Sequence, residues 1–233
     1  PNQADYDYAF TDFVKQSTKT IMWQSTADHL NMADQTQVDI LSERDPSLQF
    51  IQLPGKHVRR NAWLAAQLVM RTQPAIRQSD IFEALARFPG VSRRFEKLGE
   101  NLYTDYAHHP DEIAATLQLA HEVNKNVVVV YQPHQNVRQH EIMSEYGYAE
   151  CFESAKQTYF LPTFLSREDT ELPVLSQQEL IDATSEKSAV VAAQMDEDLW
   201  EAIQKHREAG DLVLIMSAGD MDHWLRQKVS AQE

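Results

Sequence analysis

The chain has 233 residues, enough for two small domains, and its 42% apolar and 9% aromatic residues are sufficient to build hydrophobic cores. Its formal net charge of −14 disfavours nucleic acid or an anionic membrane surface as a partner. A phosphate ligand stays compatible with that charge, because such a site needs only local positive charge.

The cysteine and glycine residues indicate the redox environment of the protein and exclude some types of nucleotide-binding site. The single cysteine, Cys151, cannot form an internal disulfide, which fits a reducing, cytoplasmic environment. No apolar run approaches the roughly 20 residues of a membrane span. The six glycines form neither GxGxxG nor GxxxxGK followed by Ser or Thr. Since a backbone cradle for a triphosphate uses such glycines, the two commonest nucleotide-binding loops are excluded within this chain. The chain begins at Pro1 rather than methionine, and we expect it to be a piece of a longer protein.

The first ninety residues are predicted to mix helices with short strands. Apolar spacing favours helices over 6–14 and 57–71, and the turn Pro54–Gly55 should follow a strand. Asp80 to Glu83 has capping-box spacing, which predicts a helix that begins at Asp80 and ends before Pro89. Strands are expected at 20–23, 39–41 and 50–53.

From Val91 onward, strands alternate with helices. Val127 to Tyr131 is a continuous run of mainly β-branched apolar residues, typical of a strand buried on both faces. Pro110 suits the first turn of a helix. This alternation predicts an α/β fold with a mostly parallel sheet covered on both faces. The expected strands are 94–98, 102–106, 127–131, 158–161 and 211–216. Helices are expected over 177–184 and 197–209; a further helix should start at 110, and two others should include residues 142 and 224. We predict two domains, 1–90 and 91–233.

The densest polar cluster, Asp105 to Glu112, lies where a predicted strand ends and a helix begins. Ligands of open α/β sheets bind outside the carboxyl ends of strands, and helix N-termini favour anions. The adjacent histidines His108 and His109 are suited to orienting a nucleophile, binding a metal or holding a phosphate. A capped surface turn with solvated histidines explains the same pattern.

A second cluster, Gln132 to Arg138, also follows a buried strand. Two such loops in one parallel sheet face the same side and are able to share a ligand. The alternative is an ordinary loop in which Asn136 caps the next helix.

Two weaker signals lie elsewhere. His57 and Asn61 are four apart at the start of a helix, so they share one face, and an asparagine side chain suits the edge of a purine base. A structural role at the helix start is the simpler explanation. Arg93 and Arg94 open the second domain and are able to present a guanidinium to phosphate.

These clusters occur in the order seen in the Mur family of ATP-dependent amino-acid ligases. Gly55–Ala62 resembles the family's G-x-H-N-x-x-N-A helix, and Phe88–Glu96 resembles F-x-G-V-x-R-R-F-E. Asp105–Glu112 resembles D-Y-x-H-H-P-x-E, Gln132–His134 resembles Q-P-H, and Ser217–Asp220 resembles the terminal G-A-G-D. The Q-P-H loop points to the L-alanine-adding branch, because the murein-peptide recycling branch has E-P-R-S-N-T there.

The resemblance implies three domains: one binding a UDP-sugar, a central ATPase domain, and a Rossmann-like C-terminal domain. Residues 1–90 would be the end of the central domain and 91–233 the C-terminal domain. The implied reaction activates the UDP-N-acetylmuramate carboxylate as an acyl phosphate, which the amine of L-alanine attacks during peptidoglycan synthesis. ATP and Mg²⁺ are the implied cofactors, with the metal ligands and P-loop outside this chain, so the chain alone should be inactive.

By analogy with the family, seven residues receive roles. His57 and Asn61 would lie at the adenine, Arg94 at an ATP phosphate, and Asp105 at the ribose hydroxyls. The catalytic side chains, which would frame the amino acid and the reacting carboxyl, are Tyr106, His108 and Arg138.

Departures from the family pattern are also present. Val58 stands where an asparagine is usual, Gln135 where a second arginine is common, and Thr104 in place of the first of two aspartates. Ala27–Leu30 resembles a metal-ligand fragment of the central domain, but it falls after the helix that should follow that motif. The alternatives to an L-alanine-adding ligase are a non-catalytic nucleotide- or partner-binding module that retains the fold, and a murein-peptide recycling ligase.

Overall fold

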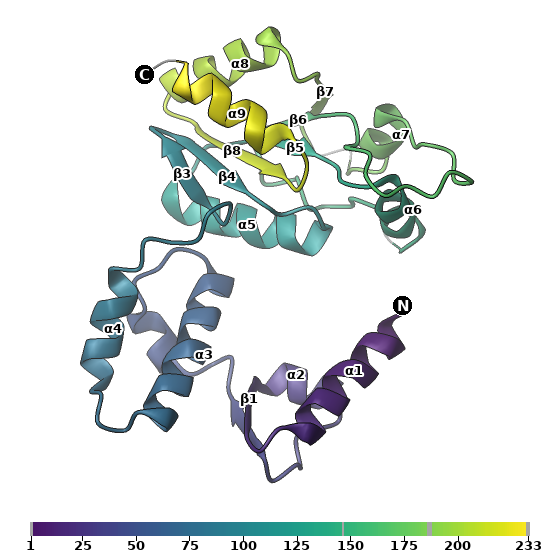
Figure 1. The fold of residues 1–233 in the computed structure, drawn as a ribbon. Coiled ribbons are helices and arrows are strands. Elements are labelled where there is room, and N and C mark those ends of the chain that lie inside the picture. Colours follow the sequence, from purple (N-terminus) through teal and green to yellow (C-terminus); the bar gives the residue numbers. More distant parts are fainter. Residues whose placement is uncertain (1, 146, 186–187, 232–233) are drawn as a thin grey trace. The chain divides into compact units, whose positions relative to one another are not determined.

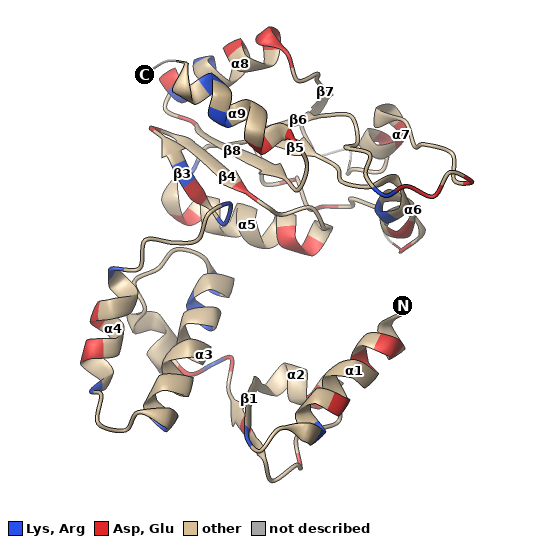
Figure 2. Cartoon of the chain, viewed as in Figure 1, with Lys and Arg blue, Asp and Glu red and all other residues tan. Residues whose placement is uncertain are grey.

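The computed structural model describes residues 2–145, 147–185 and 188–231, which divide into two compact units, Pro1–Phe88 and Pro89–Glu233 (Figure 1). None of the helices in the described ranges is both long and apolar enough to cross a membrane. Acidic side chains are spread over most helices of both units, whereas basic ones gather at the start of α3 (Figure 2).

The first unit is built on a two-stranded parallel sheet with helices on both faces. Residues of β1 alternate between two small cores, because Met22 packs with Val38 beside α2, and Trp23 packs with Leu41 against α3. Its elements are α1 (Gln3–Gln16), β1 (Thr20–Trp23), α2 (Gln24–His29), β2 (Val38–Leu41), the 3₁₀ helix η1 (Pro46–Phe50), α3 (Lys56–Thr72) and α4 (Gln78–Ala86).

Three features of this unit differ from the sequence predictions. The strand expected over 50–53 is wrong, because Phe50 ends a 3₁₀ helix whose first turn is set by Pro46 and capped by Asp45. The helix expected to begin at Asp80 begins at Gln78, and Asp80 instead accepts hydrogen bonds from the Arg77 guanidinium. The helix α2 was not predicted. The α1 helix is present, but its aromatic side chains are exposed and only Val14 is buried.

The second unit contains a six-stranded sheet in the order β3-β4-β8-β5-β6-β7, in which only β3 runs antiparallel to its neighbour. The predicted α/β class with a mostly parallel sheet is confirmed. Its elements are β3 (Glu96–Gly99), β4 (Leu102–Asp105), α5 (Pro110–Val123), β5 (Val127–Gln132), α6 (Asn136–Glu145), β6 (Gln157–Phe160), α7 (Gln177–Asp182), β7 (Val190–Ala192), α8 (Glu197–Glu208), β8 (Leu212–Ser217) and α9 (Met221–Ser230).

Helices cover both faces of this sheet because the central strands are apolar on both sides. Val127, Val129 and Tyr131 of β5 pack in the core formed with α5, α6 and α7. Val128 and Val130 pack in the core formed with α8 and α9. The chain moves from β5 outward to β7 on one face and returns over the other face to β8, which lies between β4 and β5. This reversal is the switch point where such sheets bind ligands.

Two strands of this unit also differ from the sequence predictions. The strand predicted over 94–98 begins at Glu96, because Arg93 and Phe95 have φ angles of 58° and 48°, outside the extended region. The short edge strand β7 was not predicted.

A polar cluster joins the opposite, amino-terminal edge of the sheet to α8. The Asp211 carboxylate, which is 1% exposed, accepts hydrogen bonds from Lys156 at 2.7 and 2.8 Å and lies 2.8 Å from His206 Nδ1. Burial opposes ionisation, but Lys156 and His206 outweigh it and lower the pKa of Asp211. The cluster therefore fastens the starts of β6 and β8 to the end of α8.

Asp211→Asn should lower the free energy of unfolding by about 1–3 kcal/mol, because it removes the negative charge that pairs with Lys156. The loss is limited because Lys156 is half-exposed and water replaces part of the lost interaction. Because folding lowers the pKa of Asp211, this carboxylate makes its full contribution to the stability of the folded chain when the pH is above the ordinary pKa of an aspartate. That stabilisation disappears as the pH falls through the folded value. Urea unfolding at pH 7 and at acid pH measures both effects. The control is the Glu201→Gln change of an exposed residue on α8, and an equal loss of stability in the two variants would contradict the role of Asp211.

Candidate active site

The carboxyl ends of β4, β8 and β5 lie level with one another. Asp105 pairs with Met216, Met216 pairs with Tyr131, and Gln132 pairs with Ser217. Because all three strands are parallel, the segments that follow them leave the sheet at the same edge. The 105–112, 132–138 and 217–220 segments are therefore neighbours, although the first and last of them are more than 100 residues apart in sequence.

The second and third of these segments are joined by a buried hydrogen-bond network. Gln132 accepts from Ser217 Oγ at 2.7 Å and donates to Asp220 at 2.8 Å, and the Gly219 amide donates to Ser217 Oγ at 2.9 Å. A Cβ on Gly219 would lie 2.6 Å from Gln132 Oε1 and 2.7 Å from the Phe164 side chain. Glycine is therefore required for this close approach.

The 105–112 segment is held by its own carboxylates. Asp105 is buried and accepts hydrogen bonds from the amides of Phe95 at 2.7 Å and Ala107 at 2.8 Å. Glu112 accepts from the amides of His108 and His109, and His109 caps α5. The predicted helix start at Pro110 is confirmed.

A continuous series of ring contacts crosses the edge. The guanidinium carbons of Arg93 and Arg94 lie 4.7 and 5.5 Å from the centre of the Tyr106 ring. Tyr106 meets His108 edge-on with 5.6 Å between ring centres, and His108 meets His134 in the same way at 6.0 Å. The His134 ring is stacked on Phe164, with 9° between their planes. Two guanidinium groups and one histidine thus contact the Tyr106 ring, and the second histidine is reached through the first.

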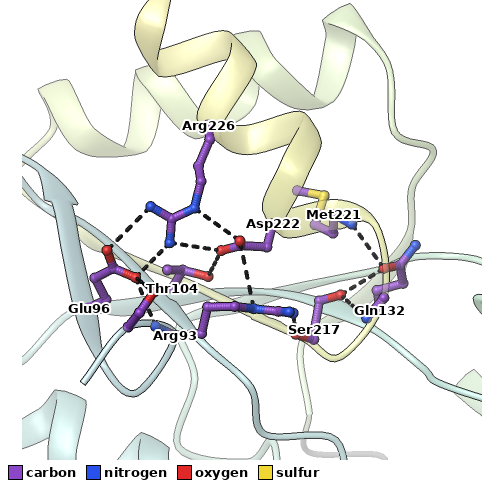
Figure 3. Close-up of polar contacts among 10 residues, drawn as sticks. Arg93, Glu96, Thr104, Gln132, Ser217, Met221, Asp222 and Arg226 are labelled. Atoms are coloured by element: carbon purple, nitrogen blue, oxygen red, sulfur yellow. Dashed lines mark hydrogen bonds and ion pairs between the residues drawn. The ribbon is translucent and has the colours of Figure 1, made fainter.

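Behind these rings lies an ionic network (Figure 3). Arg226 of α9 donates to Glu96 at 2.6 Å and to Asp222 at 3.0 Å, and buried Thr104 donates to Asp222 at 2.9 Å. The Arg226 hydrogen bonds lower the pKa of Glu96 from 4.5 to about 2, against the opposing effect of burial. Glu96 is therefore ionised throughout the neutral range.

The remaining predicted residues of this unit are placed differently. Arg138 lies on α6, 45% exposed, and pairs with Glu141 of the same helix at 2.5 Å. Asn136 does not cap α6, contrary to the simpler alternative. It is the first helical residue, its side chain holds Pro173 and Leu175, and the Glu168 carboxylate accepts from its amide at 2.8 Å.

His57 and Asn61 belong to the first unit, near the start of α3, where His57 is half-buried and Asn61 exposed. His29, from the fragment that resembles a metal motif, lies 3.0 Å from Asp7. In the part of the chain that the structure describes, no group of three or more His, Cys, Asp or Glu side chains is arranged to hold a metal ion.

Sequence reasoning missed several contributors to this edge. Phe164 gave no signal, because its role depends on contacts with His134 and Gly219 from two other segments. Asp222 and Arg226 looked like ordinary charged residues of a final helix. Gly219 lies in the predicted Ser217–Asp220 motif, but that motif did not indicate its close approach to Gln132 and Phe164.

The comparisons with known proteins agree with this architecture. The family model described as Mur ligase, glutamate ligase domain, matches residues 93–219. The chain belongs to the Mur ligase family, and the resemblance noted in the sequence is confirmed. A UDP-N-acetylmuramate--L-alanine ligase of Paracoccus denitrificans is 31% identical over 213 residues, covering 88% of this chain and 44% of that protein. One from Dinoroseobacter shibae is 35% identical over 183 residues, covering 75% of this chain and 38% of that protein.

Solved structures show the same fold. UDP-N-acetylmuramate-alanine ligase MurC of Thermotoga maritima superposes with a TM-score of 0.55 at 24% identity, covering 78% of this chain and 39% of that one. Folylpolyglutamate synthase of Mycobacterium tuberculosis, complexed with ADP, superposes with a TM-score of 0.53 at 15% identity, covering 78% of this chain and 42% of that one. The chain thus spans less than half the length of the two curated ligases from Paracoccus and Dinoroseobacter.

Gly219→Ala should destabilise the second unit by about 1–3 kcal/mol, because the new methyl group has to displace Gln132 or Phe164. Gly99→Ala is the matched control, since there the added Cβ meets only the end of the flexible Arg207 side chain. Thermal unfolding of both variants measures the difference. Equal melting temperatures would show that the close approach at Gly219 is not required.

The His134 imidazole should titrate below the ordinary histidine value of 6.5. Burial lowers its pKa first, and the neighbouring His108 lowers it further. Acidification through the ordinary value should therefore reduce stability, because the unfolded chain takes up this proton more readily. An NMR titration measures the midpoint. His108→Asn should raise it, whereas His121→Gln, at the other end of α5, should not. A midpoint at or above 6.5 in the unmodified chain would refute the prediction.

Proposed function

We propose that this chain is part of an ATP-dependent ligase that joins L-alanine to UDP-N-acetylmuramate in peptidoglycan synthesis. The observation that carries the proposal is the meeting of Arg94, Tyr106, His108 and His134 at the switch point of the sheet. The names and 31–35% identities of the two curated relatives support this choice of substrates. The unpaired Cys151 is consistent with a cytoplasmic location.

In this proposal the second unit is the C-terminal domain and the first is the end of the central ATP-binding domain. ATP would supply the phosphoryl group that activates the carboxylate as an acyl phosphate. Arg94 fits a phosphate contact, because its exposed guanidinium makes no hydrogen bond or ion pair with any residue that the structure describes. Asp105, which accepts hydrogen bonds from the amides of Phe95 and Ala107 and from Thr116 Oγ1, is proposed at the ribose hydroxyls. His57 and Asn61 are proposed at the adenine. No Mg²⁺ ligand is proposed from this chain.

Tyr106, His108 and Arg138 are proposed to frame the amino acid and the reacting carboxyl. The Tyr131 hydroxyl donates to the His108 carbonyl at 3.0 Å and so fixes that part of the backbone. Arg138 pairs with Glu141 at the surface, where such a pair contributes little stability. Little stabilising free energy would therefore be lost if Arg138 released Glu141 and bound a substrate carboxylate instead.

The proposal is tested with the complete protein that contains this chain. UDP-N-acetylmuramate, L-alanine and ATP are supplied, and formation of ADP and of the ligated product is measured, with glycine and L-serine as competing amines. The expected result is product that depends on L-alanine. The 233-residue chain should show no turnover, because it has no glycine-rich triphosphate loop. Absence of ligation by the complete protein would favour a non-catalytic binding module instead.

Arg138→Ala in the complete protein should raise the KM for L-alanine or lower kcat, roughly tenfold for the loss of one charge-assisted hydrogen bond. Glu141→Gln is the matched control, because it removes the surface partner and leaves the Arg138 guanidinium in place. Steady-state kinetics distinguish the two variants. If Arg138→Ala has unchanged kinetics, the residue has no part in the reaction.

A further inference from the structure

Two consecutive arginines contact the same tyrosine ring but differ in every other contact. The Arg93 guanidinium donates to the Ser217 carbonyl at 2.8 Å and lies 3.6 Å from Asp222, in addition to covering Tyr106 (Figure 3). Arg94 is exposed, and among the described residues its guanidinium contacts the Tyr106 ring without a hydrogen bond or ion pair. One guanidinium is thus engaged by the protein, and the other is available to a ligand.

The backbone that presents these two side chains is held in an unusual conformation. Arg93 and Phe95 both have positive φ angles, of 58° and 48°, which are costly for residues with a Cβ and persist only where the surroundings fix them. Two carboxylates do so here. Glu96 accepts from the Arg93 amide at 2.8 Å, and Asp105 accepts from the Phe95 amide at 2.7 Å.

One of these two carboxylates, Glu96, also connects the turn to α9. Glu96 is bonded to Arg226, Arg226 to Asp222, and Asp222 lies beside the Arg93 guanidinium. Thr104 completes the arrangement by donating to Asp222. An aspartate at position 104 would place a second carboxylate against Asp222, so the threonine is matched to this network.

We infer that Arg93 is a positioning residue, held by Asp222, Glu96 and Arg226, which fixes Tyr106 and the turn at Ser217 so that Arg94 faces the ligand. The inference rests on the proposed function, in which Tyr106 and Arg94 lie beside the reacting groups. It assigns different tasks to two neighbouring residues of identical type. It also assigns a task to Asp222 and Arg226, which do not touch the ligand.

The positioning role is tested in the 233-residue chain by NMR. The Ala218 amide reports on the Ser217 carbonyl, because the two groups share one peptide bond. Arg93→Lys and Asp222→Asn should both shift the Ala218 amide nitrogen resonance and the His108 imidazole resonances. Arg94→Lys should leave the Ala218 resonance in place. An unmoved Ala218 resonance in the first two variants, or an equal shift in the third, would overturn the inference.

A milder variant keeps the test decisive if Asp222→Asn unfolds the unit. Thr104→Val removes one hydrogen bond to Asp222 and leaves its ion pairs intact. It should give a smaller shift of Ala218 in the same direction, and the absence of any shift would count against the network. Asp198→Asn, an exposed carboxylate on α8, serves as the control for loss of one negative charge.

Kinetics of the complete protein provide the second readout. Arg93→Lys and Asp222→Asn should share a fall in kcat of roughly 10- to 100-fold with little change in the KM for ATP, as expected for misplaced reacting groups. Arg94→Ala should mainly raise the KM for ATP. The same pattern in all three variants would contradict the division of tasks. If the unmodified complete protein shows no ligation, the proposed function fails, whereas the Ala218 measurement still decides the role of Arg93.

Discussion

The strands β5 and β8 lie side by side at the centre of the second unit, and each is buried along its whole length. Their register follows from apolar residues that alternate between two cores, so a slip by one residue would exchange the contents of both. This register places Gln132 opposite Ser217. The network with Gly219 and Asp220, and with it the edge where the polar segments meet, depends on that alignment.

From the hydrogen-bonded pair Gln132 and Ser217 the site extends in two directions. Toward β6, the Gly219 backbone lies against Phe164, which supports the His134 ring. Toward β4, the Ser217 carbonyl accepts from Arg93, whose guanidinium covers Tyr106. Tyr106 and His134 are then connected through His108. These contacts therefore form a closed ring.

The balance between structural and ligand-binding groups is visible in the charges. The carboxylates of Glu96 and Asp222 are balanced by the guanidinium groups of Arg226 and Arg93, whereas Arg94 is left with its charge exposed. A chain with a net charge of −14 therefore still presents positive charge at the one edge where a phosphate or carboxylate would bind. Net charge disfavours nucleic acid and membrane partners, but it does not report on this local arrangement.

Local pattern was sufficient where a segment's environment follows from its own residues. The apolar run 127–131 predicted a strand buried on both faces, and Pro110 predicted the start of α5, because each signal acts within a few residues. The order of the family motifs likewise indicated the fold class. Local pattern failed at 50–53 and at Asn136. In the first case Phe50 ends a 3₁₀ helix and residues 51–53 belong to no helix or strand. In the second case a potential capping residue instead binds segments distant in sequence.

The candidate site divides in the same way. The sequence by itself determined that polar residues follow buried parallel strands, and hence that the 105–112 and 132–138 segments share one edge of the sheet. Only the tertiary structure decided which side chains meet there: that Arg93 faces inward and Arg94 outward, that Thr104 bonds to Asp222, and that Phe164 supports His134. The reason is physical. These contacts join segments separated by 30 to more than 100 residues, and their geometry depends on strand order and register, which no local spacing encodes.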